Sequence, residues 1–229
     1  MIPRVIHSFW GAGPKTPLAA RCQASWARCC PGWEIREWDL KAVQALDPPE
    51  ARRFLDAAAA CGRWAAASDF ARMRVLAEFG GVYLDFDVEL VRPLDDLPAT
   101  GWIASEAKPG GGVWLNPGGG IALPAGSVVA GHLLAAYRAA PFDPQVAMMP
   151  LINRLLGEAL ARAPEVVRLD PDFFSPIGTD GRLVRTERTH GIHRYAMADA
   201  TAVQRFGRWC AWHGLGPALR ALAKLRRRT

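Results

Sequence analysis

Two aspartates separated by one residue, Asp85 and Asp87, are the strongest candidates for chemistry in this sequence. They stand near the end of the run from Val82 to Val88, whose period of two predicts one strand with Tyr83 and both aspartates on the same face. At ~3.3 Å per residue, their α-carbons would lie about 6.6 Å apart, close enough to share one cation. A divalent ion on acidic oxygens can hold a diphosphate and neutralise a departing phosphate.

A second charged pair, Asp69 and Arg72, lies on a predicted helix just before this strand. Apolar residues recur at helical spacing over residues 68–79, and the pair Gly80-Gly81 predicts the end of the helix. Asp69 falls inside the apolar arc of the helix and Arg72 at its margin, so both are expected to point into the protein. Charges placed there need partners, and Arg72 adds a cation suited to a phosphate.

The elements that must position these groups alternate along the chain. Strands are predicted over residues 5–9 and 33–38, and helices from Thr16-Pro17 to about Cys30 and from Pro49 through Ala60. This order predicts an α/β fold, a largely parallel sheet with helices on both faces, in a single domain. Ligands gather at the carboxyl ends of strands in such sheets, where Trp10 would offer a flat face to a nucleobase.

The later part of the chain gives weaker signals. Short strands are predicted at residues 102–104 and 121–123, and helices at residues 127–138 and 146–162. A glycine-rich loop over residues 109–120 contains Asn116. The segment 171–200 is rich in helix and strand breakers, carries His190 and His193, and is predicted to be mostly loop.

The net charge of +6 is concentrated at the C-terminal end. Residues 205–229 hold seven basic residues and no acid, which leaves 21 basic and 22 acidic residues in the rest of the chain. A nucleic-acid-binding protein would need basic groups spread along one face, so that class is excluded. We predict a catalytic domain over residues 1–204 and a basic amphipathic tail over residues 205–229, which would rest on an anionic membrane surface.

Nothing in the sequence indicates export or a membrane span. The first ten residues lack the pattern of a signal peptide, and no run reaches the ~18 apolar residues that a spanning helix needs. The cysteines are odd in number and lack zinc-site spacing, so we expect free thiols in the cytoplasm, with the tail at the inner face of the membrane. The cysteines are Cys22, Cys29, Cys30, Cys61 and Cys210.

Taken in order, these motifs resemble the family of glycosyltransferases with a DXD sugar-binding motif, numbered thirty-two. The resemblance covers the first hundred or so residues and implies a GT-A fold, a Mn²⁺ or Mg²⁺ cofactor and retention of anomeric configuration. From this resemblance and the basic tail together, we predict that a hexose passes from a UDP- or GDP-linked sugar to a saccharide or lipid-linked acceptor, in surface polysaccharide or glycolipid synthesis. The segments that carry it are Ile6-His7-Ser8-Phe9-Trp10-Gly11, Ser25-Trp26, Ser68-Asp69-Phe70-Ala71-Arg72 and Gly80-Gly81-Val82-Tyr83-Leu84-Asp85-Phe86-Asp87.

The resemblance implies roles for residues in these motifs. Trp10 would stack on the base, and Tyr83 would help to position the donor. Asp69 and Arg72 would hold the donor sugar and its phosphate. Of the two DXD carboxylates, Asp85 would contact the sugar, the ribose or the metal. Asp87 would ligate the metal directly.

Two later residues complete the predicted site. Asn116 corresponds to an asparagine often found in the middle of such domains. His193 stands where members of the family carry a late histidine, which makes it a candidate metal ligand. Here Arg194-Tyr195 follows it, and the Ser-Trp pair of the family is missing.

Two other functions fit parts of the pattern. The Asp85-Phe86-Asp87 strand also resembles that of haloacid-dehalogenase-type phosphohydrolases, in which the first aspartate is a nucleophile and the second an acid/base. That motif usually opens the chain and precedes a Gly-Thr turn, whereas Val88-Glu89 follows here. A non-catalytic module that binds a nucleotide sugar is the third alternative. Hydrolysis of a simple aryl phosphate without use of any nucleotide sugar would support the phosphohydrolase. Binding of a nucleotide sugar without turnover would support the non-catalytic module.

Overall fold

The computed structural model of the chain describes residues 1–11, 13–108, 111–140, 142–177 and 183–196. Its centre is a six-stranded sheet in which β8 alone runs antiparallel to its neighbours, so the sheet is mixed but mostly parallel. The predicted α/β class is therefore confirmed. In spatial order the strands are β2 (Glu34–Trp38), β1 (Val5–Phe9), β3 (Gly81–Tyr83), β8 (Ile121–Leu123), β5 (Trp102–Ile103) and β9 (Val167–Arg168).

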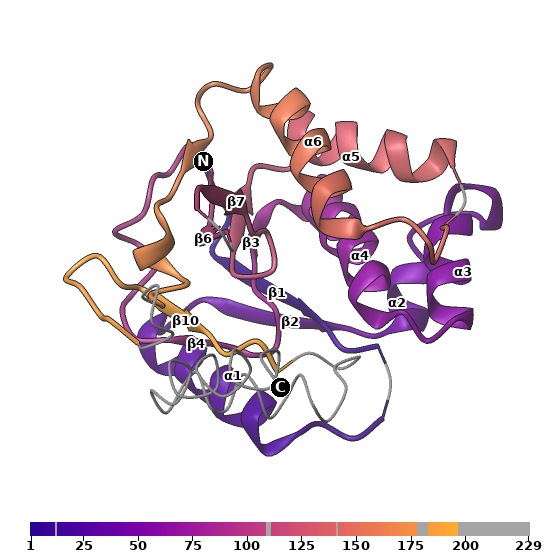
Figure 1. Ribbon diagram of the computed structural model, residues 1–229. Helices are drawn as coiled ribbons and strands as arrows, with labels where there is room; N and C mark the ends of the chain where they lie inside the picture. Colours follow the sequence, from indigo (N-terminus) through magenta and orange to yellow (C-terminus); the bar gives the residue numbers. More distant parts are fainter. Residues whose placement is uncertain (12, 109–110, 141, 178–182, 197–229) are drawn as a thin grey trace, which may run out of the picture.

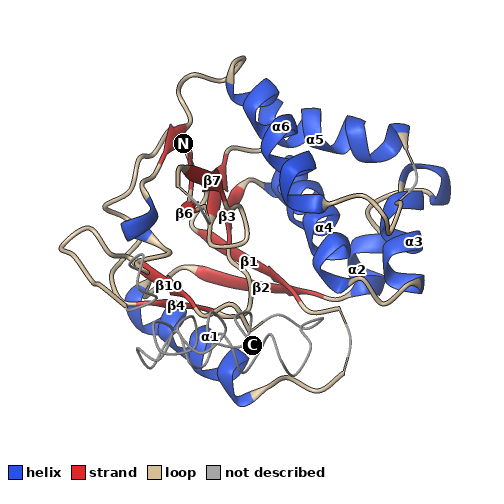
Figure 2. Cartoon of the chain, viewed as in Figure 1, coloured by secondary structure: helices blue, strands red, loops and turns tan. Residues whose placement is uncertain are grey.

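Helices cover both faces of this sheet (Figure 1, Figure 2). One apolar core joins one sheet face to a helical layer, and a second core joins the other face to α1 (Pro17–Cys29). The helical layer consists of α2 (Leu40–Gln44), α3 (Arg53–Ala60), α4 (Trp64–Phe79), α5 (Val128–Ala139) and α6 (Met148–Leu160).

Two small sheets and two short helices complete the described fold. In the small sheets, β4 (Val88–Leu90) pairs with β10 (Gly191–His193), and β6 (Ser105–Ala107) with β7 (Val113–Leu115), both antiparallel. The 3₁₀ helices are η1 (Pro49–Ala51) and η2 (Pro171–Phe173). β7 lies inside the predicted glycine-rich loop and β10 inside the segment predicted as mostly loop, so both strands correct the prediction.

Most predicted helices and strands form, with changes at their ends. The Thr16 side chain caps α1 by accepting from the amide of Ala19 at 3.2 Å, as its position predicted. The helix predicted from Pro49 to Ala60 is wrong in one respect, because Arg52 (φ −113°, ψ 15°) interrupts it between η1 and α3. The short helix α2, capped by Asp39, had not been predicted.

The single strand predicted from Val82 to Val88 is also wrong. β3 ends at Tyr83, the chain turns, and Val88 donates its amide to the Asp85 carbonyl oxygen at 3.0 Å before β4 begins. An apolar run cannot distinguish one strand from two short strands around a turn, because both place apolar residues against the core. Asp85 and Asp87 therefore lie in a turn at the carboxyl end of β3.

Two glycines bring this strand into the centre of the sheet. α4 ends at Gly80 (φ 62°), and Gly81 (φ 104°) opens β3 in a conformation that favours glycine. A Cβ on Gly81 would stand 2.8 Å from the carbonyl oxygen of Val5, so a side chain would separate β3 from β1. The change from helix to strand is therefore abrupt, and the α4 residues lie close to the turn.

Two further predictions concern the chain as a whole. Cys22, Cys29, Cys30 and Cys61 are free thiols, as expected, while Cys210 lies outside the described residues. Within the parts of the chain that the structure describes, no helix is both long and apolar enough to cross a bilayer. The tail predicted at 205–229, and with it the boundary at 204, lies outside those parts.

Candidate active site

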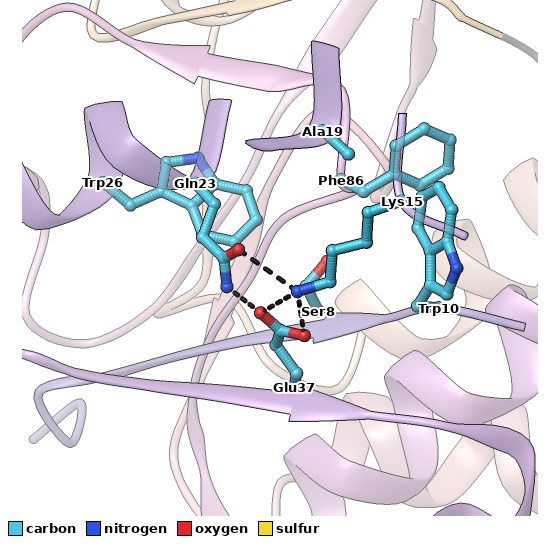
Figure 3. A pocket seen from close by; sticks show the side chains of 8 residues that line it. All are labelled: Ser8, Trp10, Lys15, Ala19, Gln23, Trp26, Glu37 and Phe86. Carbon is cyan, nitrogen blue, oxygen red and sulfur yellow. Dashed lines mark hydrogen bonds and ion pairs between the residues drawn. The ribbon is translucent and has the colours of Figure 1, made fainter. Parts of the chain in front are cut away.

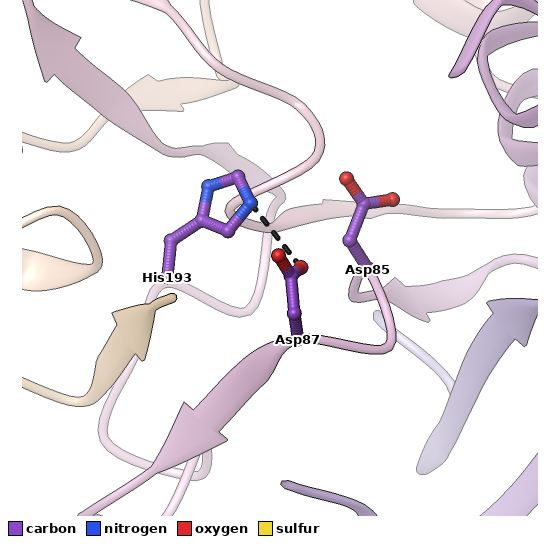
Figure 4. A group of neighbouring side chains, drawn as sticks. All are labelled: Asp85, Asp87 and His193. Atoms are coloured by element: carbon purple, nitrogen blue, oxygen red, sulfur yellow. Dashed lines mark ion pairs between the residues drawn. The ribbon is translucent and has the colours of Figure 1, made fainter. Parts of the chain in front are cut away.

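Asp85, Asp87 and His193 converge at the turn after β3 (Figure 4). One ligand atom from each lies within 4.8 Å of the others, and His193 Nε2 is 3.3 Å from Asp87 Oδ1. The aspartates come from the turn, whereas His193 belongs to β10, which reaches the turn by pairing with β4. The sequence predicted one shared face of a strand; in the structure the turn and the β4–β10 pairing bring the three groups together.

Arg72 connects this cluster to α4. Its guanidinium donates to Asp69 at 2.6 Å and to Asp85 at 3.0 Å, and its Cζ lies 4.8 Å from the centre of the Tyr83 ring. Arg72 is 3% exposed, so the helical spacing correctly predicted that it and Asp69 face inward. The Ser68 hydroxyl lies 2.9 Å from the Tyr83 hydroxyl, which fixes the edge of this ring.

Burial and pairing set the charges of these groups. Burial raises the pKa of Asp69 to about 6, although Arg72 opposes the shift and Asp85 adds to it. Burial also disfavours the charged form of Asp87, but the pairing with His193 and the backbone amide of Ala196 outweigh it, and its pKa is lowered. Asp87 is therefore a carboxylate at neutral pH, as a metal ligand must be.

Asn116 directly follows β7 and lies next to His193. Its side-chain oxygen accepts from the amides of Gly118 and Gly119, each at 3.1 Å. Its side-chain nitrogen donates to Glu106 at 2.8 Å and lies 3.2 Å from His193 Nδ1. The structure thus places Asn116 beside the predicted site.

Sequence reasoning missed Glu106, whose carboxylate accepts from both Asn116 and the Tyr195 hydroxyl, the latter at 2.7 Å. Glu106 stands on β6, directly opposite Trp114 of β7, in a short hairpin. No local pattern in the sequence distinguishes it from the exposed acidic residues. Only its partners, which are distant in the chain, make it part of the site.

Trp10 directly follows β1 and contacts Phe86 of the DXD turn. Its ring meets Phe86 edge to face at 4.7 Å, and its indole nitrogen donates to the Gly13 carbonyl oxygen at 2.7 Å. Both rings line a small pocket that also contains an ion pair between Lys15 and Glu37 (Figure 3). The lining residues are Ser8, Trp10, Lys15, Ala19, Gln23, Trp26, Glu37 and Phe86.

The site's central residues fall within a known family signature. Residues 17–103 match the family described as "Glycosyltransferase sugar-binding region containing DXD motif". Residues 17–103 of this chain thus carry the sugar-binding region of the DXD-motif glycosyltransferases. The matched region of this glycosyltransferase contains α4 with Asp69 and Arg72, and the turn with Asp85 and Asp87. The family resemblance is thereby confirmed, and it favours glycosyl transfer over the phosphohydrolase alternative.

One solved structure supports the fold. The PaToxG glycosyltransferase is 16% identical, with a TM-score of 0.57, over 71% of this chain and 70% of that one. This likeness supports the predicted GT-A-type fold of the DXD-motif glycosyltransferase. A structure described as a transferase mutant is 12% identical, with a TM-score of 0.42, over 71% of this chain and 86% of that one. No curated protein sequence matches the chain.

Proposed function

We propose that this glycosyltransferase is metal-dependent and moves a hexose from a UDP- or GDP-linked donor to a saccharide or lipid-linked acceptor. The observation that carries the proposal is the convergence of Asp85, Asp87 and His193 within 4.8 Å. Carboxylate oxygens are the ligands that Mg²⁺ and Mn²⁺ prefer, and such ions keep open positions for phosphate oxygens. The donor set therefore fits the ion that the resemblance implies.

In this proposal Asp85 and Asp87 hold the ion, and His193 is the third group within reach. The ion, when bound, supplies positive charge beside the departing nucleotide diphosphate. Arg72 remains charged, because its pairing with Asp85 and Asp69 keeps its pKa above the ordinary value despite burial. It therefore offers a fixed cation for the donor phosphate or sugar, with Asp69 holding it in place.

The remaining residues position the donor. The pocket beside Trp10 is proposed to receive the nucleobase, because an aromatic face and polar side chains line it next to the DXD turn. Tyr83 lies under the Arg72 guanidinium and would orient it. Asn116 would hold the His193 ring in position through the contact with its Nδ1. Retention of anomeric configuration is proposed from the family resemblance alone.

The proposed acceptor is inferred from the composition of the tail. Residues 205–229 combine seven basic residues with leucine and tryptophan, a composition that suits contact with anionic lipid at the inner face of a membrane. An enzyme held there would reach a lipid-linked acceptor, and we therefore propose a role in surface polysaccharide or glycolipid synthesis. The domain proposed to carry the transfer reaction comprises residues 1–204.

The decisive test is donor hydrolysis with Mn²⁺ across a panel of UDP- and GDP-linked hexoses. Asp87→Asn should lower metal-dependent hydrolysis on the order of 100-fold or more, because a neutral amide binds the ion and balances its charge poorly. Asp95→Asn is the matched control, since Asp95 pairs with exposed Arg4 away from the cluster. Circular dichroism checks that both variants remain folded.

Near-normal hydrolysis by Asp87→Asn would contradict the metal assignment. Binding of a nucleotide sugar by the wild type, with no turnover toward water or any acceptor, would favour the non-catalytic module.

A further inference from the structure

A tryptophan on the hairpin of β6 and β7 takes no part in either apolar core. Among the tryptophans that the structure describes, only Trp10 and Trp114 lie outside both cores. Trp10 lines the pocket proposed for the nucleobase, whereas the proposed function assigns no role to Trp114, which stands half-buried on β7. An indole that does not hold the core together is available for binding, and its flat apolar face suits the C–H face of a sugar ring.

The pairing of the two strands places Trp114 beside the site. Glu106 and Trp114 are directly opposite each other in the hairpin, so their side chains lie on the same face, with Cβ atoms about 5 Å apart. The Glu106 carboxylate accepts from Asn116 at 2.8 Å, and the same Asn116 nitrogen lies 3.2 Å from His193 Nδ1. This face of the hairpin therefore connects the cluster at the DXD turn with Trp114.

A cation lies at the outer end of the same face. Lys108 is exposed, follows Glu106 by two residues, and holds its ammonium over the Trp114 ring, 5.3 Å from the ring centre. Lys108 has no carboxylate partner among the residues that the structure describes. An exposed contact between a cation and an aromatic ring is weak, so an anionic ligand can pair with the ammonium and uncover the ring for stacking.

The inner end of this face accepts hydrogen bonds. Oε2 of Glu106 accepts from Asn116 and from the Tyr195 hydroxyl, while Oε1 accepts from no residue in the described part of the chain. A carboxylate oxygen can only accept, so Oε1 suits a ligand hydroxyl and repels a ligand acid. A ligand on this face would therefore turn a hydroxyl toward Glu106 and an acidic group toward Lys108.

We propose that this face, formed by Glu106, Lys108 and Trp114, binds the acceptor, and that the acceptor is an acidic saccharide. The sugar ring stacks on Trp114, its carboxylate or phosphate pairs with Lys108, and a hydroxyl beside Glu106 is directed toward the donor site. This inference rests on the proposed transfer to a saccharide and narrows the chemical class of that saccharide. A neutral saccharide would gain the stacking but no ion pair.

The first experiment measures binding without metal or donor. In protein labelled with ¹⁵N-tryptophan, the Trp114 indole signal is identified by its absence in Trp114→Phe. It should shift when the methyl glycoside of glucuronic or galacturonic acid is added, or when glucose 6-phosphate replaces the carboxylate with a phosphate. The neutral methyl glucoside and galactoside should bind about 2- to 5-fold more weakly, which is the difference that an exposed ion pair supplies.

Three variants divide the binding among the residues of this face, with affinities measured on the ligand signals. Lys108→Gln should remove the preference for the acidic saccharides. Trp114→Ala should weaken their binding about 10-fold, because the stacking surface is lost. Val113→Ala is the matched control, since Val113 is 56% exposed and alternates with Trp114 along β7, so its side chain lies on the other face of the hairpin.

Three results would overturn the inference. They are a Trp114 signal that no acidic saccharide moves, equal affinity for acidic and neutral saccharides, and the same loss of binding in Val113→Ala as in Trp114→Ala. A Trp114 signal that moves only when residues 217–229 are deleted would assign this face to the tail and would also overturn it.

The second experiment measures transfer with Mn²⁺, a donor that the wild type hydrolyses, and the acidic saccharide that binds best. Acceptor and water compete for the same donor, so Trp114→Ala should lower the ratio of transfer to hydrolysis about 10-fold, while Val113→Ala should keep the wild-type ratio. Absence of transfer to this saccharide, or an unchanged ratio in Trp114→Ala, would overturn the inference. A wild type that hydrolyses no donor would instead count against the proposed function, and the binding spectra would still decide the role of the hairpin.

Discussion

At the scale of single residues, the backbone of Gly118 lies in close contact with the Asp85 carboxylate. A Cβ at Gly118 would lie 2.3 Å from Asp85 Oδ2 and 3.3 Å from an Arg72 nitrogen. The Gly118 carbonyl oxygen also accepts the Asp85 amide at 3.0 Å. Any larger residue would therefore occupy space that the carboxylate needs, and glycine is required here for close approach rather than for an unusual backbone conformation.

We expect Gly118→Ala to lower metal-dependent donor hydrolysis about 10- to 100-fold, because the added methyl group must push the Asp85 carboxylate out of place. Gly119→Ala is the matched control, since the nearest atom to its added Cβ, the Asn116 carbonyl oxygen, lies at an ordinary 3.4 Å. Initial rates and thermal unfolding of both variants are the measurements. Equal rates in the two variants would show that the position of Asp85 is not critical.

At the scale of secondary-structure elements, His7 connects its own strand β1 to β2 and to the end of α4. Its Nδ1 accepts from the Trp38 indole of β2 at 3.0 Å, and its Nε2 donates to the Gly80 carbonyl oxygen at the end of α4 at 2.9 Å. The ring is fully buried, and this burial lowers its pKa to about 4. The arrangement requires a neutral ring, since a second proton on Nδ1 would face the indole N–H donor.

The protein should lose stability as the pH falls from 6.5, the ordinary pKa of His7, toward about 4. In that window the unfolded chain binds a proton at His7 that the folded protein does not, so the free energy of unfolding falls by up to about 1.4 kcal/mol per pH unit. His7→Gln should lack this component of the slope, which the difference between wild type and variant isolates.

Urea unfolding at a series of pH values measures both proteins. A His7→Gln profile parallel to that of the wild type would mean that His7 already titrates normally in the folded protein.

At the scale of the whole molecule, charge is divided unevenly between the proposed domain and the tail. The chain outside residues 205–229 holds nearly equal numbers of acidic and basic residues, and the tail carries the excess. A uniform basic surface would favour many anionic partners, whereas a local cluster with interleaved apolar residues favours an interface between water and lipid. The charge pattern thus distinguishes two parts of the chain. One is the proposed catalytic domain, and the other is the tail that is proposed to hold this domain at the membrane, near a lipid-linked acceptor.

We expect the full chain to sediment with liposomes containing anionic lipid and not with zwitterionic ones. Deletion of residues 217–229 removes Arg220, Lys224 and the three final arginines, and should abolish this binding. Donor hydrolysis should be unchanged, because the deleted residues are not part of the proposed site. Unchanged sedimentation after the deletion would refute the membrane proposal.

The sequence alone determined those features that depend on local pattern. The alternation of helices and strands predicted the α/β fold, Thr16 and Pro17 predicted the start of α1, and helical spacing turned Asp69 and Arg72 inward. The DXD motif and its flanking residues predicted the family, which the match over residues 17–103 then supported. These features are encoded within a few turns of helix or one strand, so propensity and periodicity are sufficient to predict them.

Only the tertiary structure decided how the site is assembled. The turn at Asp85 and Asp87 forms because β4 pairs with β10 instead of continuing β3, and the same pairing brings His193 to the turn. Glu106 and Asn116 join it through the β6–β7 hairpin. Strand pairing and side-chain hydrogen bonds between distant residues depend on the register of the whole sheet, which no local window of the sequence contains.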